Sequence, residues 1–183
     1  MFIENGYRNV SLAAIAREAH VAVRTIYVKF GGKAGLLNAV LQSQRDAVFA
    51  DMPPMTPDGR SLDDVLFEFA RRYLQLLTGP RALSLLRMVM AESMNDPQLC
   101  AGFIEAGPER TRRMLAAFFG QAHVREQLLP GCTPDQLAAD LTACLLGDRM
   151  PELLLTGHLP QRPVPDREIR DTVTLFLMGR RIH

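Results

Sequence analysis

Two short helical patterns within residues 9–37 meet at the tripeptide AHV (19–21), with no glycine or proline between them. Ser11 can cap the first helix, in which apolar residues recur at helical spacing, and the second covers about residues 22–30. Two short helices joined so tightly are typical of a helix-turn-helix, whose second helix fits the major groove of DNA, roughly 12 Å wide. The pattern therefore predicts a small DNA-binding module, although pairs of short helices also occur in proteins with other functions.

The rest of the chain also has the apolar periodicity of helices, with neither an alternating strand pattern nor an internal repeat. We therefore expect an all-α protein. The clearest linker is the proline-rich segment 51–59. The expected helices cover residues 33–50, 61–78, 82–94, a short segment to about 106, a segment from Pro108, residues 134–156 with a kink at Pro151, and a last helix from Asp166.

Composition and charge narrow the class of protein. Apolar residues make up 48% and charged residues 22% of the chain, the balance of a soluble globular protein. No apolar run approaches the roughly 18 residues that span a bilayer, and the first ten residues (1–10) lack the apolar core of a signal peptide. The three cysteines are widely spaced and no zinc-ligand spacing occurs, so we expect a cytoplasmic protein without a metal or other cofactor. Residues 1–50 hold six basic and three acidic side chains, against 15 and 17 in the remainder, as an N-terminal nucleic-acid module would.

Many fixed spacings near the N-terminus agree with one known pattern: an aromatic residue, Gly-Tyr, Ser, Ile-Ala, Ala-x-Val, Thr-x-Tyr, Phe, Lys and Leu-Leu. The matching residues are Phe2, Gly6, Tyr7, Ser11, Ile15, Ala16, Ala19, Val21, Thr25, Tyr27, Phe30, Lys33, Leu36 and Leu37. This stretch resembles the N-terminal DNA-binding domain of the tetracycline-repressor (TetR) family. Segment 87–119 also resembles the AefR-like branch of the C-terminal domains in that family.

The resemblance implies a helix-turn-helix DNA-binding domain over residues 1–46 and a helical effector-binding and dimerisation domain over residues 47–183. It implies a bacterial repressor that binds a palindromic operator in double-stranded DNA as a homodimer and is released by a small apolar or amphipathic effector. A DNA-binding regulator without a small-molecule effector is the alternative. An enzyme is disfavoured, because the sequence has no paired inward carboxylates, no Glu-x-x-His motif and no activated nucleophile.

The resemblance also places eight residues at the DNA surface, on the second helix and at the ends of its neighbours. They are Ser11, Ala22, Val23, Arg24, Thr25, Tyr27, Lys29 and Lys33. The alternatives are that Tyr27 packs in the small core, that Lys33 is a solvated charge and that Val23 is plain surface.

Three departures from the family pattern matter. His20 stands where the family usually has glycine, at a turn whose left-handed backbone favours glycine. Ala22 and Arg24 stand where serine and glycine are common, so Ala22 loses a polar contact while Arg24 can reach a phosphate or a guanine. Family members carry a basic arm and most of a first helix before the position of Phe2, so we expect a truncated first helix and weak DNA affinity.

An apolar effector pocket among the later helices is a further implication of the resemblance. Methionine and aromatic side chains are its candidates, because methionine adapts to varied ligand shapes. The candidate residues are Phe67, Phe69, Tyr73, Met88, Met90, Glu92, Met94, Phe103, Phe118 and Phe119. For each apolar member, ordinary core packing is the alternative. Glu92 lies in an otherwise apolar helix and needs a partner, which could be Arg81, Arg87, a pocket group or a cationic ligand.

The last two helices are expected to form a dimer interface. Helix 134–156 is apolar on more than one flank, and the family pairs such helices with those of a second copy in a four-helix bundle. The expected interface residues are Leu146, Met150, Leu153, Leu154, Ile169, Val173, Phe176 and Leu177. Asp148 and Arg149 could add hydrogen bonds. A dimer would also bring two recognition helices to half-sites about 34–36 Å apart. The basic run 108–113 opens an amphipathic helix, for which a solvated face is expected rather than a second DNA site.

Overall fold

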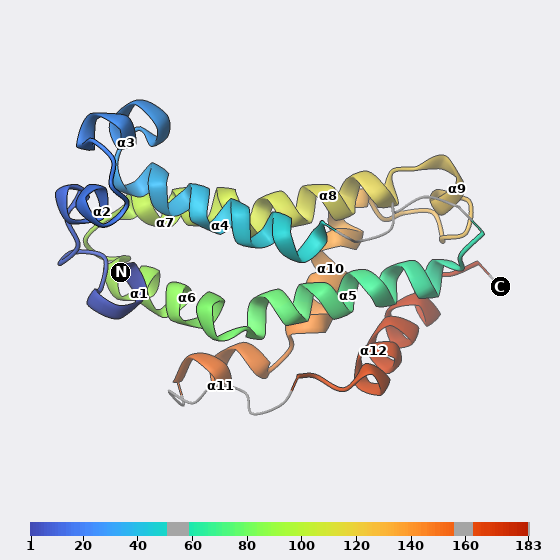
Figure 1. Ribbon diagram of the computed structural model, residues 1–183. Coiled ribbons are helices and arrows are strands. Elements are labelled where there is room, and N and C mark those ends of the chain that lie inside the picture. Colours follow the sequence, from blue (N-terminus) through green and yellow to red (C-terminus); the bar gives the residue numbers. More distant parts are fainter. Residues whose placement is uncertain (51–58, 156–162, 183) are drawn as a thin grey trace. The chain divides into compact units, whose positions relative to one another are not determined.

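The structure is a computed structural model that describes residues 1–50, 59–155 and 163–182, and Figure 1 traces its helices along the chain. Over these ranges the protein is helical, with no strand and one isolated β-bridge between Leu128 and Arg181, so the expected all-α class is confirmed. The helices are α1 (Phe2–Asn5), α2 (Leu12–Glu18), α3 (Val23–Phe30), α4 (Lys33–Phe49), α5 (Leu62–Thr78), α6 (Pro80–Glu92), α7 (Pro97–Ile104), a π-helical turn (Glu105–Glu109), α8 (Arg110–Phe119), α9 (Ala122–Arg125), α10 (Pro134–Leu146), α11 (Arg149–Leu155) and α12 (Asp166–Met178). The linker predicted at 51–59 falls outside the described residues except for Gly59.

The chain forms two compact units. The first unit comprises Met1–Ala47 and Pro80–Glu109, and the second comprises Val48–Gly79 and Arg110–His183. Helices α6 and α7 therefore belong to the same unit as the predicted helix-turn-helix, although they lie outside the segment 1–46. The division into functional domains at residue 46 stays a prediction, because compactness and function are different properties.

The hydrophobic core of the first unit joins the N-terminal helices to α6 and α7. Leu37 of α4 and Leu99 of α7 are completely buried in it. Fully burying one such side chain stabilises the fold by about 1.5–3 kcal/mol. Gly102 of α7 lies so close to α4 that a Cβ there would meet the Asn38 side chain at 2.5 Å. The buried members of this cluster are Phe2, Tyr7, Val10, Leu37, Leu85, Val89 and Leu99.

The core of the second unit is built around α5. Ser61 caps α5 by accepting a hydrogen bond from the Asp64 backbone N–H at 3.1 Å, and an apolar stripe of α5 faces inward. The α5 side chains pack with α8, α10 and α12 in one cluster. Aromatic rings run through it, with ring centroids 5.9 Å apart for Phe49–Phe69 and 5.6 Å apart for Phe69–Tyr73.

Two predicted helix boundaries were wrong. The expected kink at Pro151 is absent, and the helix instead breaks at Gly147, whose φ of 44° is accessible to glycine at little cost. Pro151 lies in the first turn of α11, where the missing N–H leaves no gap in the hydrogen bonding. The expected restart at Gly107-Pro108 is a continuous π-helical turn between α7 and α8.

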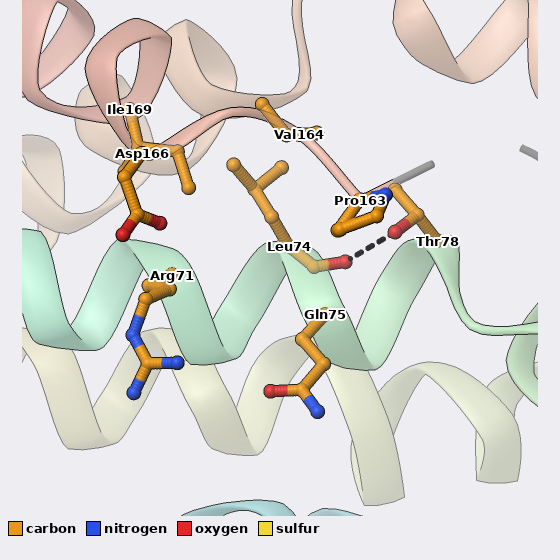
Figure 2. A pocket seen from close by; sticks show the side chains of 8 residues that line it. All are labelled: Arg71, Leu74, Gln75, Thr78, Pro163, Val164, Asp166 and Ile169. Atoms are coloured by element: carbon orange, nitrogen blue, oxygen red, sulfur yellow. Dashed lines mark hydrogen bonds between the residues drawn. The ribbon is translucent and has the colours of Figure 1, made fainter. Parts of the chain in front are cut away.

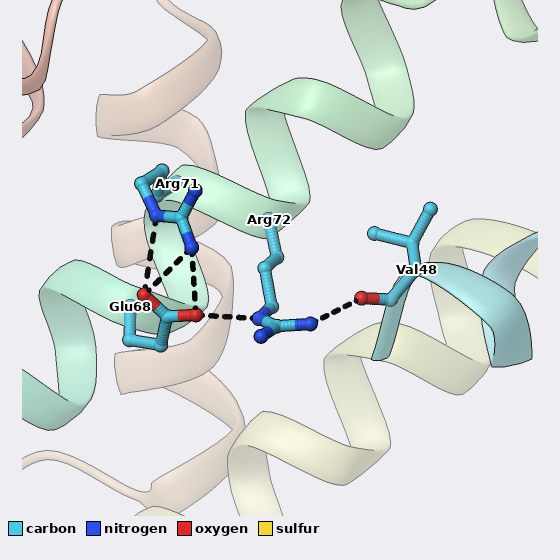
Figure 3. Close-up of polar contacts among 4 residues, drawn as sticks. All are labelled: Val48, Glu68, Arg71 and Arg72. Carbon is cyan, nitrogen blue, oxygen red and sulfur yellow. Dashed lines mark hydrogen bonds and ion pairs between the residues drawn. The ribbon is translucent and has the colours of Figure 1, made fainter. Parts of the chain in front are cut away.

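A charged network ties the end of α4 to α5 within the second unit. Glu68 accepts hydrogen bonds from Arg71 at 2.9 Å and from Arg72 at 2.6 Å, and Arg72 donates to the Val48 carbonyl at 2.8 Å (Figure 3). Burial alone would raise the pKa of the Glu68 carboxyl, but the hydrogen bonds from Arg71 and Arg72 outweigh it and lower the pKa. Arg72 thus donates to a carbonyl in the last turn of α4, where side chains commonly supply hydrogen bonds to the helix end.

We predict that Tyr73→Phe removes a loss of stability at alkaline pH. Burial raises the pKa of the Tyr73 phenol to about 12, from 10.0. A raised pKa favours the neutral phenol in the folded state, so its stabilisation is complete below pH 10 and is lost as the pH rises toward 12. The native protein should therefore lose about 1 kcal/mol more than Tyr73→Phe between pH 8 and 11, measured by urea unfolding. Tyr27→Phe, at an exposed tyrosine, is the control and should behave as the native protein does.

Candidate nucleic-acid interface and effector cavity

Local hydrogen bonds fix the first helix of the helix-turn-helix and the turn that follows it. The Ser11 hydroxyl accepts from the Ala14 N–H at 3.1 Å and caps α2, as predicted. After α2 the chain turns sharply, and the Val21 N–H donates to the Ala16 carbonyl at 2.9 Å. His20 occupies the left-handed region with a φ of 54°, the only non-glycine residue to do so in the described segments. The left-handed turn that the family usually makes with glycine is therefore made here by His20.

One side of helix α3 is anchored by a buried residue, and the opposite side is exposed to solvent. Ile26 is 4% exposed and anchors the helix in the first unit. Opposite this anchor, Val28 is 78% exposed, and Arg24 and Thr25 flank it on the same outward face. Tyr27 is 57% exposed, so its ring does not pack in the small core. This outward face carries a cation, a hydroxyl and apolar groups. Cations and hydroxyls can contact phosphates and base edges, and apolar groups can contact thymine methyls.

Glycines set how closely α3 and α4 approach. Gly31 follows α3 with a φ of 74°, and its N–H donates to the Tyr27 carbonyl at 2.8 Å. A Cβ on Gly35 would lie 1.7 Å from the Phe30 carbonyl oxygen, so only glycine permits this contact. The direction of α3 is therefore fixed by the first turn of α4.

Seven of the eight residues predicted at the DNA surface are exposed: Ser11, Ala22, Val23, Arg24, Thr25, Tyr27 and Lys29. Lys33 differs. Its ammonium lies 4.4 Å from the centre of the Tyr7 ring and donates to the Arg8 carbonyl at 3.3 Å. Burial lowers the pKa of Lys33, although the Glu92 carboxylate acts in the opposite direction. Lys33 is thus a partly buried group that holds the segment before α2, and to reach a phosphate it would have to change rotamer.

Glu92 also differs from expectation. Its carboxylate pairs with Arg8, with Nε and Oε2 2.7 Å apart, a partner that was not among the alternatives considered from the sequence. Periodicity could not reveal this partner, because the two residues are far apart in the chain and meet only through the fold.

The residues predicted to line an effector pocket are divided between the two units. Phe69, Tyr73, Phe118 and Phe119 are buried in the core of the second unit, with Phe67 packed against it. Met88 and Phe103 pack against the core of the first unit, whereas Met90 is 51% and Met94 is 91% exposed. The aromatic candidates therefore pack in or against a hydrophobic core, as the alternative interpretation expected.

A cavity of about 280 Å³ lies in the second unit between α5 and the start of α12. In Figure 2, α5 contributes one side of its lining and the segment 163–169 the other. None of the predicted pocket residues lines it, since the aromatic stripe of α5 faces the core instead. The lining residues are Arg71, Leu74, Gln75, Thr78, Pro163, Val164, Asp166 and Ile169. This mixture of apolar and polar groups suits a small amphipathic molecule.

The residues predicted at a dimer interface fall into two groups. Ile169, Val173, Phe176 and Leu177 are between 2% and 6% exposed and pack in the core of their own chain, so a partner could not contact them directly. Leu146, Met150, Leu153 and Leu154 are half-buried. The exposed apolar side chains of this region are Leu155, Leu175 and Met178. Arg149 pairs with Glu168 and donates to the Leu145 carbonyl at 2.7 Å, so it is engaged within the chain.

Within the described segments, none of the helices combines the length and apolar character that crossing a membrane would require. The basic run 108–113 opens α8 with Arg110, Arg112 and Arg113 exposed and Thr111 buried, as an amphipathic helix would.

Comparison with known proteins identifies the fold. Residues 1–40 match the family described as bacterial regulatory proteins, tetR family. Residues 64–179, more than half of the chain, match the AefR-like transcriptional repressor C-terminal domain. The chain belongs to the TetR family. The family resemblance of the N-terminal motif and of segment 87–119 is thereby confirmed, and the proteins of this family are transcriptional regulators rather than enzymes.

Individual TetR-family relatives agree with this assignment. The chain is 31% identical over 102 residues to the HTH-type transcriptional regulator UidR of Escherichia coli K12, a match that covers 55% of the chain and 50% of UidR. The chain thus spans about half the length of the curated relatives it matches. A TetR-family regulator from Mesorhizobium loti has 27% identity and a TM-score of 0.78, covering 99% of this chain and 91% of its own. The flavonoid-responsive regulator FrrA has 27% identity and a TM-score of 0.75, covering 98% of this chain and 91% of its own.

We predict that the left-handed turn in this TetR-family helix-turn-helix tolerates only certain residues. His20→Val should destabilise the protein by about 1–2 kcal/mol, because a β-branched residue is strained at positive φ. His20→Gly and His20→Asn, which accept this conformation, should be as stable as the native protein or slightly more so. Urea unfolding of the three variants measures the difference, and equal stability of His20→Val would contradict the role of the turn.

Proposed function

We propose that this chain is a cytoplasmic transcriptional repressor that binds a palindromic operator in double-stranded DNA as a homodimer and is released by a small amphipathic effector. The observation that carries the proposal is the outward face of α3, where Arg24, Thr25 and Val28 stand on a helix anchored by Ile26. A buried anchor beneath an exposed polar face is what a helix needs in order to enter the major groove without leaving its own core.

Specific contacts on α3 follow from side-chain chemistry. Arg24 can donate two hydrogen bonds to a guanine or pair with a phosphate. Val28 can pack against a thymine methyl, and the Tyr27 hydroxyl can reach a phosphate. Ser11 and Lys29 lie at the ends of α2 and α3, where their donors can meet the DNA backbone.

Dimerisation is supported by apolar surface on the last helices. Leu155 is 85%, Leu175 is 72% and Met178 is 66% exposed. Exposing apolar side chains of this size to water is unfavourable, so covering them would stabilise the protein. We infer that the outer face of α12 and the end of α11 meet the same surfaces of a second copy. The four α12 residues first expected there instead support this face from inside.

The effector is proposed to occupy the cavity between α5 and α12. Arg71, Gln75, Thr78 and Asp166 offer hydrogen bonds at its edge, and Leu74 with Val164 offers apolar contact. A planar, hydroxylated aromatic compound combines both properties, and the similar regulator FrrA is named as flavonoid-responsive. A regulator without an effector remains the second candidate, and native mass spectrometry of the purified protein for a bound small molecule would separate the two.

DNA binding is tested at Arg24. Arg24→Ala should weaken binding to a selected palindromic duplex by about tenfold or more, because one bidentate base contact contributes about 1–3 kcal/mol. Arg125→Ala removes the same charge from an exposed position in the second unit and should change affinity little. Fluorescence anisotropy at fixed salt measures both. Equal effects of the two variants would mean that only net charge matters and that α3 is not the recognition helix.

Dimerisation is tested at Leu175. Leu175→Glu should shift the protein toward monomer in light scattering coupled to size exclusion, because a carboxylate would then have to be buried between two copies. The control is Met94→Glu, since Met94 is 91% exposed in the first unit. A native protein that is monomeric at micromolar concentration, or a dimer that survives Leu175→Glu unchanged, would refute this interface.

A further inference from the structure

We propose that Glu92 is a positioning residue for DNA binding: it does not touch DNA, but its carboxylate holds Arg8 and with it the segment that leads into α2. The observation is an ion pair between the last residue of α6 and the loop between α1 and α2, both within the first unit.

The two partners of the pair differ in how deeply they are buried. Nε of Arg8 lies 2.7 Å from Oε2 of Glu92, so the two charged groups form a close ion pair. The Glu92 side chain is 14% exposed, whereas the Arg8 side chain is 61% exposed. The carboxylate is therefore fixed in the body of the unit, and the guanidinium reaches over it from the surface.

The place of Glu92 on its helix makes the pair necessary. Glu92 ends α6, where the helix dipole is negative, and the last turn of α6 contains no basic residue to compensate. A largely buried carboxylate in that place is unfavourable unless a cation comes from elsewhere. Arg8 supplies that cation.

Other groups around the pair hold the same loop. The Lys33 ammonium donates to the Arg8 carbonyl at 3.3 Å and lies over the Tyr7 ring. Tyr7 is 8% exposed and packs on Phe2 with ring centroids 5.7 Å apart. Burial raises the pKa of the Tyr7 phenol, and the nearby carboxylates of Asp96 and Glu92 add to the rise. The phenol therefore stays neutral, while Arg8 pairs with Glu92 and the Glu92 carboxylate also acts on the Lys33 ammonium.

The loop matters because it sets where the helix-turn-helix begins. Val10 is buried in the core shared with α6 and α7, and the next residue, Ser11, caps α2. If Arg8 is released, the segment from Tyr7 to Ser11 loses its link to α6, and α2 and α3 lose a restraint on their orientation. DNA affinity then falls because more conformational freedom has to be lost on binding.

The sign of the effect separates this proposal from simple electrostatics. A carboxylate near the DNA-binding surface repels phosphates, so its neutralisation would strengthen binding if charge alone mattered. A positioning role predicts the opposite. Glu92→Gln should therefore weaken binding by about three- to tenfold, whereas Glu18→Gln, which removes an exposed charge from α2, should leave affinity unchanged or raise it.

The experiment uses the duplex that the unsubstituted protein selects from a random-sequence pool, with anisotropy titrations at several salt concentrations. Glu92→Gln and Arg8→Gln should each cause the same loss, and the double variant should lose no more than either one, because both remove one interaction. The salt dependence should keep its slope in all three. Urea unfolding accompanies each variant, and Arg8→Gln reports on the pair even if Glu92→Gln fails to fold, since Arg8 is mostly exposed.

Two results would overturn the proposal. One is stronger binding by Glu92→Gln, as for Glu18→Gln, which would assign Glu92 only its charge. The other is additive losses together with a salt slope reduced by about one in Arg8→Gln, which would make Arg8 a phosphate contact independent of Glu92. Failure of the unsubstituted protein to select any duplex would instead count against DNA binding itself.

Discussion

The shared hydrophobic core of the first unit is the constraint on which the DNA-binding surface depends. Helices of seven or eight residues, such as α2 and α3, cannot form stably by themselves, and a segment of about 46 residues buries too little apolar surface to be robust. Leu85 and Val89 of α6 and Leu99 of α7 supply the missing surface around Leu37. The helix-turn-helix is therefore part of a larger unit, in which Ile15 of α2 packs against the same core as α6 and α7.

Much of the fold could be predicted from the sequence where the determinants are local. The caps at Ser11 and Ser61 and the apolar stripe of α5 follow from spacing within one or two turns, and the left-handed turn at His20 followed from the family resemblance. The break at Gly147 could not be told from the sequence by the presence of Pro151, because a proline in the first turn of a helix does not disturb it. The exposed face of α3 was also predictable, since the five expected DNA-surface residues that lie on α3 are all exposed.

The rest of the candidate site could not be predicted, because it depends on contacts between distant parts of the chain. Periodicity shows that Phe69 and Tyr73 face inward, but a buried face does not reveal whether a cavity lies next to it. The cavity is instead lined by the neighbouring flank of α5 and by residues 163–169, which only the packing of α12 brings together. Arg8 and Glu92 show the same limit: each is an ordinary charged residue in the sequence, and only the fold brings the loop after α1 to the end of α6.

Helix α4 contributes residues to both units, because the division between them falls after Ala47. Its first turn carries Lys33 in the first unit, and its last turn carries Phe49, which stacks on Phe69 in the second. Arg72 holds the Val48 carbonyl at that end, so the end of the helix cannot move without disturbing the Glu68 network. A ligand beside Arg71 would lie next to this network, because Arg71 shares Glu68 with Arg72. Such a ligand would change the network only to the extent that it binds one arrangement of these charges more tightly than another.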